Sequence, residues 1–343
     1  MEKIITFLVP AYNAEPYLDK CLGSLVKAGE EAEIIVIDDG SKDKTPQIAD
    51  RWQAEYPNII RVVHQENGGH GEGINVGMKL ATGLYFKVVD ADDWLDEEAL
   101  KVYLQRIREM RDAGKMADMV FTGFVFDQVS TGKQKAEWYD NIFKIRDQVI
   151  EWNQIRFWRV TQILMIHAIT FRTQMLKDAN FALPKHRFYE DNVYVYMGTF
   201  NSKNLAYFRI PLYHYYVGRE GQSINIDVMA ARYQQQIDNM EQIALAYTWD
   251  EIKKLPRMHK KTMVHLLVLY LALTLNDISI KNTKETYKHY KVFTKRWRTE
   301  NPSLYWKMNV RNIWLLTNLL IRPIRTLATR IGYKLVYRST NWG

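Results

Sequence analysis

The first 130 residues alternate between short apolar runs and segments whose apolar residues recur at helical spacing. The intervening segments predict helices, as in 95–110, where Leu100, Tyr103, Leu104 and Ile107 fall on one face. Thr45-Pro46 favours the start of another helix. Alternation of this kind predicts an α/β fold with a largely parallel sheet. The runs expected as strands are 4–9, 33–37, 59–64, 84–89 and 118–126.

Polar clusters follow three of these runs, at residues 10–13, 38–41 and 90–93. Ligands of such sheets bind beyond the carboxyl ends of the strands. Because the three clusters fall at the same edge of one sheet, we expect them to form a single site.

Carboxylates dominate two of the clusters. Asp90 and Asp92, two residues apart at a strand end, offer the oxygen ligands that Mg²⁺ or Mn²⁺ prefers. The alternative is a solvated turn before an acidic helix start. Asp38 and Asp39 suit hydrogen bonds from a nucleobase imide or from ribose hydroxyls, and the alternative there is a turn that caps the next helix.

The basic character of the chain belongs to its C-terminal part. The net charge is +8, but residues 281–343 hold 14 Lys and Arg against two acidic residues, a net charge of +12. Segments 313–320 and 324–337 have the pattern of amphipathic helices with interfacial aromatics. We expect this tail to lie on an anionic membrane face, with packing on the catalytic domain or on a second subunit as the alternative. No recognised nucleic-acid module accompanies the charge, so we expect no nucleic-acid partner.

Other features favour a globular protein of a reducing compartment. The single cysteine, Cys21, is expected to be a core residue, and no secretory signal is predicted. The apolar run 263–275 has 13 residues, short of the roughly 20 that span a bilayer, and predicts a buried helix.

Taken together, the order and spacing of these clusters resemble those of a known protein family. The segments 9–13, 35–41, 67–69, 81–83 and 90–93 resemble, in order and spacing, those of family 2 glycosyltransferases of GT-A fold. The resemblance implies a Rossmann-like α/β domain with a mostly parallel central sheet and a C-terminal α-helical region. The expected domains are 1–225, catalytic, with a nucleotide-sugar half (1–130) and an acceptor half (131–225), and 226–343, helical with the basic tail.

The same resemblance implies roles for individual residues. Asp92 would be the principal ligand of Mn²⁺ or Mg²⁺, Asp90 a second, and His214 a third, although a hydrogen-bonded strand residue is the alternative for His214. The nucleotide-sugar site would consist of Pro10, Ala11, Tyr12, Asp38, Asp39, Asn67, Gly69, Asp90 and Ala91.

One position departs from the family pattern. Ile74 stands where many relatives have an Arg that supports the donor phosphates, so Lys87 or Arg219 is expected to replace it. Arg219, with Gln222 and Ser223, belongs to a segment expected to close over the diphosphate. The Gly-rich run near Ile74 does not fit G-x-G-x-x-G, which excludes a dinucleotide site.

Glu190-Asp191 resembles the motif in which the family places its catalytic base. Inverting transfer needs a carboxylate that takes the acceptor proton. We expect Asp191 to be that base and Glu190 to position the acceptor, with a charge pair before helix 193–200 as the alternative. His167 and His265 lie in apolar runs and predict core or hydrogen-bonded histidines.

The sequence therefore predicts a metal-dependent inverting glycosyltransferase. It would move a hexose or N-acetylhexosamine from a UDP-sugar to a hydroxyl of a lipid-linked cell-surface glycan precursor. It would be cytoplasmic and peripheral on the inner face of the membrane, as a homo-oligomer or with a partner glycosyltransferase. The alternative is a non-catalytic partner subunit, against which the intact Asp92 and Asp191 argue. A nucleotidyltransferase is disfavoured, because 9–13 contains no Gly, Arg or Lys for a triphosphate.

Overall fold

The computed structural model describes residues 2–129, 131–159, 162–218 and 226–311. It divides into two compact units. Unit 1 comprises Met1–Arg156 and Met165–Arg219, and unit 2 comprises Phe157–Leu164 and Glu220–Gly343. The division thus falls close to the expected boundary at 225, except that a short segment before residue 165 joins the helical unit.

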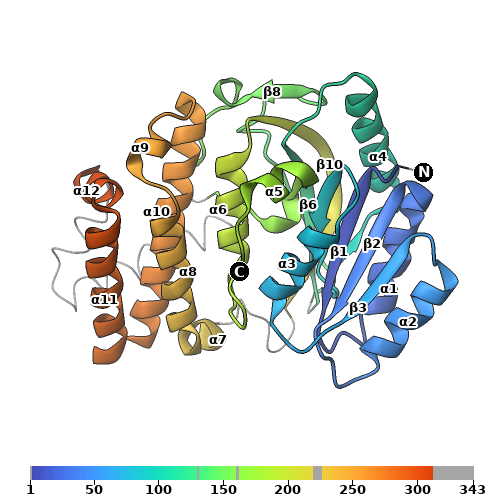
Figure 1. Ribbon diagram of the computed structural model, residues 1–343, viewed down its shortest axis with the longest axis horizontal. Coiled ribbons are helices and arrows are strands. Elements are labelled where there is room, and N and C mark those ends of the chain that lie inside the picture. The colour runs from blue at the N-terminus through green and yellow to red at the C-terminus, as the bar shows by residue number, and fades with distance from the viewer. Residues whose placement is uncertain (1, 130, 160–161, 219–225, 312–343) are drawn as a thin grey trace. The chain divides into compact units, whose positions relative to one another are not determined.

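The N-terminal half of the unit 1 sheet is parallel (Figure 1). Its strands run in the order β3-β2-β1-β4, and the predicted strands in this half are confirmed to within about two residues, inside the usual uncertainty of helix and strand ends. Every residue of β1 is buried, as expected for a strand covered on both faces. The bounds are β1 Ile5–Ala11, β2 Ala32–Asp38, β3 Ile60–His64 and β4 Tyr85–Val88.

The second half of the sheet continues in the order β9-β6-β10-β5. Strands β6 and β10 are parallel to each other, whereas β9 is antiparallel to both β4 and β6. Most of the paired length is parallel, which confirms the predicted fold class. Of these strands the sequence predicted only β6. The bounds are β5 Trp94–Leu95, β6 Met119–Gln128, β9 Ile169–Arg172 and β10 Asn204–Val217, with β7 Gln134–Glu137 beside β6 and β8 Val149–Glu151 beside β10.

Helices of unit 1 form where the sequence supplies a cap and an apolar face. Asp96 caps α4 by accepting a hydrogen bond from the Ala99 amide, and the buried face of α4 holds the residues predicted from its spacing. Cys21 is fully buried on α1, as predicted. The bounds are α1 Leu18–Leu25, η1 Val26–Glu31, α2 Thr45–Glu55, α3 His70–Leu80, α4 Glu97–Asp112, η2 Trp152–Gln154, η3 Ile166–Ala168, α5 Thr173–Ala179 and α6 Asp191–Asn201.

Unit 2 is mainly helical in its described residues from 226 to 311. Its longest helix, α10, is long and apolar enough to cross a membrane by length and composition, but 67% of its most apolar window is buried within the structure. This confirms the prediction of a buried helix at 263–275. The predicted helices at 313–320 and 324–337 lie outside the described residues. The bounds are α7 Ile226–Ala231, α8 Tyr233–Ala246, α9 Trp249–Ile252, α10 Arg257–Lys281, α11 Lys284–Glu300 and α12 Pro302–Arg311.

Candidate functional site

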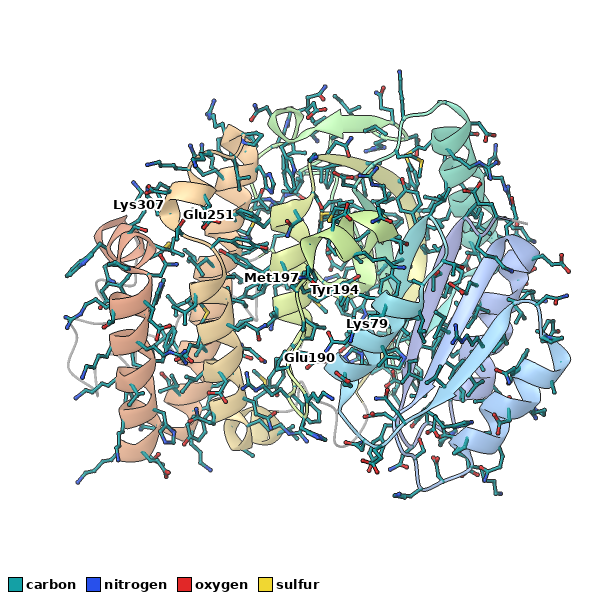
Figure 2. The ribbon with its side chains drawn as sticks, viewed as in Figure 1. Lys79, Glu190, Tyr194, Met197, Glu251 and Lys307 are labelled. Atoms are coloured by element: carbon teal, nitrogen blue, oxygen red, sulfur yellow. The ribbon has the colours of Figure 1, made fainter. Side chains whose placement is uncertain are left out.

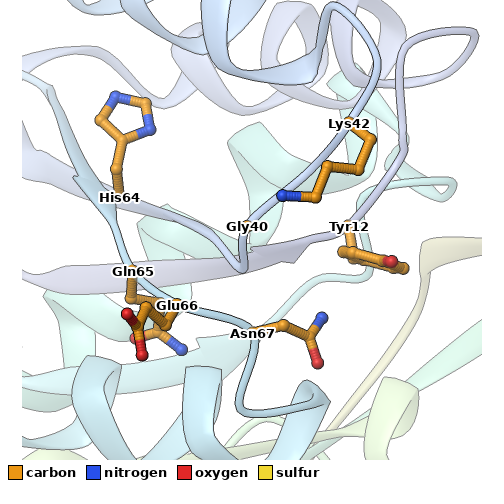
Figure 3. A pocket seen from close by; sticks show the side chains of 7 residues that line it. All are labelled: Tyr12, Gly40, Lys42, His64, Gln65, Glu66 and Asn67. Atoms are coloured by element: carbon orange, nitrogen blue, oxygen red, sulfur yellow. The ribbon is translucent and has the colours of Figure 1, made fainter.

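A pocket of ≈ 530 Å³ opens at the carboxyl ends of β1, β2 and β3 (Figure 3). Tyr12 and Lys42 lie on one side, and His64, Gln65 and Asn67 on the other. Parallel pairing places these strand ends together, because Ala11 is paired with Asp38 and Asp38 with His64. Tyr12 and Gly40, from two of the three expected clusters, therefore meet here, whereas none of the residues 90–93 lines this pocket.

Tyr12 is the member of the first cluster that reaches the pocket. Its side chain is 53% exposed, whereas Pro10 and Ala11 are buried within β1. The backbone of the strand explains the difference, because Tyr12 follows the last residue of β1. Pro10 and Ala11 are not among the described residues that line this pocket, and their contact with the nucleotide stays a prediction.

The Asp39 carboxylate shapes the pocket by holding the loop after β3. It accepts hydrogen bonds from the Gly68 amide at 2.8 Å, the Gly69 amide at 2.8 Å and Gln65 Nε2 at 2.7 Å. Asn67 Nδ2 also donates to the Asp39 carbonyl at 2.9 Å. Asp39 is only 4% exposed. The carboxylate thus fixes the pocket wall, and its contact with a nucleobase stays a prediction.

Asp38 forms a hydrogen bond with His64, a histidine that was not predicted to belong to the site. Asp38 Oδ2 lies 2.8 Å from His64 Nδ1, and the other ring nitrogen lies 3.0 Å from Asp50. The hydrogen bond to Asp38, supported by Asp50, raises the pKa of His64 above its ordinary value. Asp38 also accepts a hydrogen bond from the Ser41 amide, as expected for a turn after β2.

The turn after β4 carries the candidate metal ligands. One ligand atom each of Asp90, Asp93 and His167 lies within 4.8 Å of the other two. Two carboxylates and an imidazole are a donor set that suits a divalent cation such as Mn²⁺. Burial lowers the pKa of His167 to about 4, so its ring is neutral and able to ligate. The residues present therefore fit a cation at this place, and Asp93 and His167 were not predicted as part of it.

Asp92, the ligand expected to be most important, lies in the same turn and is half-buried. It is not one of the three groups that lie close together. Asp93 is fully buried and already accepts hydrogen bonds from Tyr213 Oη at 2.6 Å and from the Tyr216 amide at 2.8 Å. Burial, with the charge of Asp90, raises the pKa of Asp93 well above its usual range. Ala91, between the candidate ligands, is buried.

His214 is not placed as a metal ligand. Its Nδ1 lies 2.5 Å from Asp127 Oδ2, and its ring stacks on Trp94 with centroids 5.1 Å apart. Successive residues of a strand point to opposite faces, so Tyr213 points toward Asp93 while His214 points away. His214 is therefore a hydrogen-bonded strand residue, the alternative considered for it, and it is not one of the three groups that lie close together.

His70 links the two halves of the site. Its Nδ1 lies 2.5 Å from Glu190 Oε1, and its Nε2 lies 3.0 Å from Asp90 Oδ1. Burial alone would lower the pKa of His70, but the hydrogen bonds to Asp90 and Glu190 raise it well above its ordinary value. Figure 2 shows Glu190 at the beginning of α6. The segment containing His70 was noticed in the sequence for its glycines, and nothing in the spacing pointed to the histidine.

The glycines around His70 allow the close approach of this segment to the one that contains Glu190. Gly69 has φ 83°, and a Cβ there would lie 2.9 Å from the His186 amide nitrogen. A Cβ on Gly71 would lie 2.7 Å from the Pro184 carbonyl oxygen and 2.9 Å from Glu190 Cγ. These glycines therefore allow the two backbone segments to pack closely together. Close packing accounts for the Gly-rich run, although the run does not match a dinucleotide-binding motif.

Asp191, the predicted base, is the first residue of α6. Burial in the protein, supported by the charge of Glu190, raises its pKa to about 7. A carboxyl group with a pKa near neutrality is matched to proton transfer at physiological pH. The charge of His70 acts to lower the pKa of this carboxyl group, and the charge of Asp90 acts to raise it.

Lys87 is not available to the donor phosphates. It is fully buried on β4, and its Nζ donates to the carbonyls of His167 at 2.7 Å and Ile169 at 3.3 Å. The expectation that it replaces the missing Arg is therefore wrong, because its ammonium is enclosed by β9 and the residues before it. Arg219, Gln222 and Ser223, the other residues expected to contact the diphosphate, lie outside the described residues.

Burial lowers the pKa of Lys87 to about 7, which predicts a pH-dependent stability. Between that value and the ordinary 10.5, the unfolded chain holds a proton that the folded chain has lost. The free energy of unfolding should therefore rise with pH across this window, by up to about 1.4 kcal/mol per pH unit. Denaturant unfolding of Lys87→Met between pH 7 and 9 should show a shallower rise than the wild type. Exposed Lys115→Met should keep the wild-type slope, and equal slopes for all three proteins would contradict this account.

Comparisons with known proteins bear on the family that this chain resembles. Residues 6–167 match the sequence profile of Glycosyl transferase family 2. The chain is 26% identical over 250 residues to EpsH of Bacillus subtilis (strain 168), covering 68% of this chain and 64% of EpsH. It is 36% identical over 126 residues to Glycosyltransferase GlyG of Streptococcus pneumoniae serotype 4, covering 36% of this chain and 40% of GlyG. The matches thus span less than two thirds of either relative.

A structural comparison agrees on the fold. The crystal structure of S. aureus TarS 1-349 in complex with UDP-GlcNAc superposes with a TM-score of 0.64 and 21% identity, covering 98% of this chain and 91% of that one. Residues 6–167 thus resemble the family 2 glycosyltransferases, as the motifs predicted, and the sheet has the GT-A arrangement.

Proposed function

We propose that this protein is a metal-dependent, inverting glycosyltransferase that uses a UDP-sugar as donor. The pocket lined by Tyr12, Lys42 and Asn67 would take the nucleotide. Asp92 and Asp90 would face the diphosphate, and Asp191 would act as the general base. Lys42 is a lysine that lines this pocket, so it is a better candidate for a contact with the donor than the buried Lys87.

One observation carries the proposal. Asp191 has a pKa raised to about 7, and its neighbour Glu190 is joined through His70 to Asp90 at the edge that also bears the pocket. A base tuned to neutral pH and a donor site on the same sheet edge are what transfer to a hydroxyl requires. If Glu190 and Asp191 were only a charge pair at the start of α6, the connection through His70 to Asp90 would not be required.

In the proposed reaction the Asp191 carboxylate takes the proton of the acceptor hydroxyl. The hydroxyl oxygen then bonds to the anomeric carbon while the bond from that carbon to the UDP oxygen breaks on the opposite face, which inverts the configuration. A divalent cation bound at Asp90 and Asp92 would supply positive charge to the departing diphosphate. Glu190, held by His70, keeps the acceptor side of the site in place.

The names of relatives support a substrate class. TarS of Staphylococcus aureus (strain Mu50 / ATCC 700699), 26% identical over 222 residues, is a poly(ribitol-phosphate) beta-N-acetylglucosaminyltransferase, and its match covers 64% of this chain and 36% of TarS. We therefore propose a hexose or N-acetylhexosamine as the sugar and a cell-surface glycan precursor, lipid-linked, as the acceptor. The basic segment 281–343 supports a place on the cytoplasmic face of the membrane.

The proposal is tested by incubating the purified protein with a panel of UDP-sugars, with and without Mn²⁺, and measuring UDP release. We expect metal-dependent release from one sugar, increased by a membrane fraction that contains the acceptor. Calorimetry with UDP and Mn²⁺ runs in parallel. Binding without release would indicate a non-catalytic partner subunit, and absence of both would overturn the nucleotide site.

Tyr12→Ala should weaken UDP binding by about tenfold, because stacking of a base on an aromatic ring contributes about 1–3 kcal/mol. Tyr12 is the exposed aromatic residue of the pocket. Trp306→Ala is a matched control, since Trp306 is 55% exposed and lies in unit 2. Calorimetry should show the loss in Tyr12→Ala alone, and an unchanged dissociation constant would place the base elsewhere.

A further inference from the structure

His70 stands between carboxylates that come from two distant parts of the chain. Asp90 follows β4, and Glu190 precedes α6, 100 positions further along. The ring is within hydrogen-bond distance of both, at 3.0 Å and 2.5 Å. The loop before His70 is also tied to the segment before Glu190, because the His186 amide donates to the Gly68 carbonyl at 2.7 Å. The ring is thus held on a fixed support.

The Glu190 carboxylate depends on this contact. Its side chain is only 4% exposed, and within the described part of the chain the partner of that carboxylate is His70. A buried carboxylate without a partner carries a large desolvation cost, so Glu190 stays in place because of the imidazole. Asp191 is the next residue, and its position at the start of α6 follows from that of Glu190.

We propose that His70 is a positioning residue that ties the donor-side carboxylate Asp90 to the acceptor-side pair Glu190-Asp191. This inference rests on the proposed function, since it assigns those carboxylates to donor and acceptor. The imidazole fixes the distance between the base and the donor site, and it separates two carboxylates that would otherwise repel. Ile74, one helical turn after His70, is fully buried and apolar, so its side chain cannot take over the hydrogen bonds that His70 makes.

The inference predicts that loss of His70 lowers kcat but changes UDP binding little. In His70→Asn, which bonds one carboxylate at most, kcat should fall by about 30- to 100-fold, as removal of groups that orient catalytic ligands does, while the dissociation constant for UDP with Mn²⁺ changes less than about fivefold. A double-mutant cycle with Glu190→Gln should be non-additive, because both changes break one contact. His289→Gln, a histidine of unit 2, should match the wild type in kcat.

Two results would overturn the inference. One is a kcat of His70→Asn within threefold of the wild type. The other is a double variant whose loss is the product of the single losses, which would mean that His70 does not act through Glu190. A variant that only lowers the melting temperature, with kcat unchanged, would show a structural role.

A measurement without turnover separates this inference from the proposed function. The ¹⁵N signals of the His70 ring, identified by their loss in His70→Asn, should shift in both Glu190→Gln and Asp90→Asn. If the wild type releases no UDP from any donor, the proposed function fails, yet these shifts still establish the bridge between the two segments. Unchanged signals in both variants would overturn the bridge itself, whatever the activity.

Discussion

Asp191→Asn is expected to lower kcat by about 10²- to 10⁴-fold, the usual contribution of a positioned general base. The amide has nearly the same shape as the carboxyl group but cannot accept the proton of the acceptor hydroxyl. UDP binding should remain within about twofold of the wild type, because the residues that line the nucleotide pocket are untouched. Single-turnover measurements and calorimetry together check both halves of this expectation.

The pH dependence of the reaction gives a second readout of the same residue. The pKa of Asp191 is raised to about 7, and the deprotonated form is the active base. The value of kcat/KM should therefore rise with pH below about 7 and level off above it. In Asp191→Asn this limb should disappear. Asp178→Asn, an exposed aspartate of α5, should keep both the rate and the limb. A limb near pH 7 that survives in Asp191→Asn would assign it to another group.

The parallel half of the sheet was predictable because each of its strands is buried on both faces. The sequence of such a strand is a nearly continuous apolar run, as in β1 and β2. The polar clusters that follow such runs then meet at one edge, since parallel pairing brings the carboxyl ends together. The positions of Tyr12, Gly40 and Asn67 around the pocket follow from this rule.

The antiparallel half was not predictable in the same way. Strand β10 pairs with β6 in parallel and with β5 and β8 in antiparallel fashion, and its register shifts twice around Pro211. The tyrosines and the histidine of β10 do not indicate in the sequence which of its side chains point to each face of the sheet. His214 was therefore assigned to the metal site, whereas the next residue back, Tyr213, is the one that reaches Asp93. The face of a strand depends on register, and register depends on its partners.

His70 and His64 were missed for a related reason, whereas His167 is buried as predicted. Each acquires its character from residues far away in the sequence, such as Glu190 for His70 and Asp38 for His64. A spacing pattern records neighbours along a helix or strand, and it contains nothing about pairs formed by tertiary contact. Lys87 shows the opposite error, because a cation near the motifs was taken for an exposed one.

Removal of divalent metal ions should abolish the tight binding of UDP, and a set of variants should show which carboxylates hold the ion. Chelation by EDTA is expected to weaken UDP binding at least 100-fold, because the diphosphate charge then lacks its counter-ion. Mn²⁺ should restore it. Asp92→Asn should give a loss of similar size in the presence of saturating Mn²⁺.

Two sets of residues could hold the metal ion, one with Asp92 and the other made of Asp90, Asp93 and His167. The existing hydrogen bonds of Asp93 decide between them. Both of its oxygens accept hydrogen bonds from the chain, and burial raises its pKa well above the usual range, so a cation would have to displace a proton and two donors. We therefore expect His167→Gln to change the Mn²⁺-dependent dissociation constant of UDP less than about threefold, while Asp92→Asn changes it about 100-fold, as loss of a direct ligand would. The reverse order, a large loss in His167→Gln and a small one in Asp92→Asn, would place the ion on Asp90, Asp93 and His167. In that case nitrogen ligation should also favour Mn²⁺ over Mg²⁺ in the same titration.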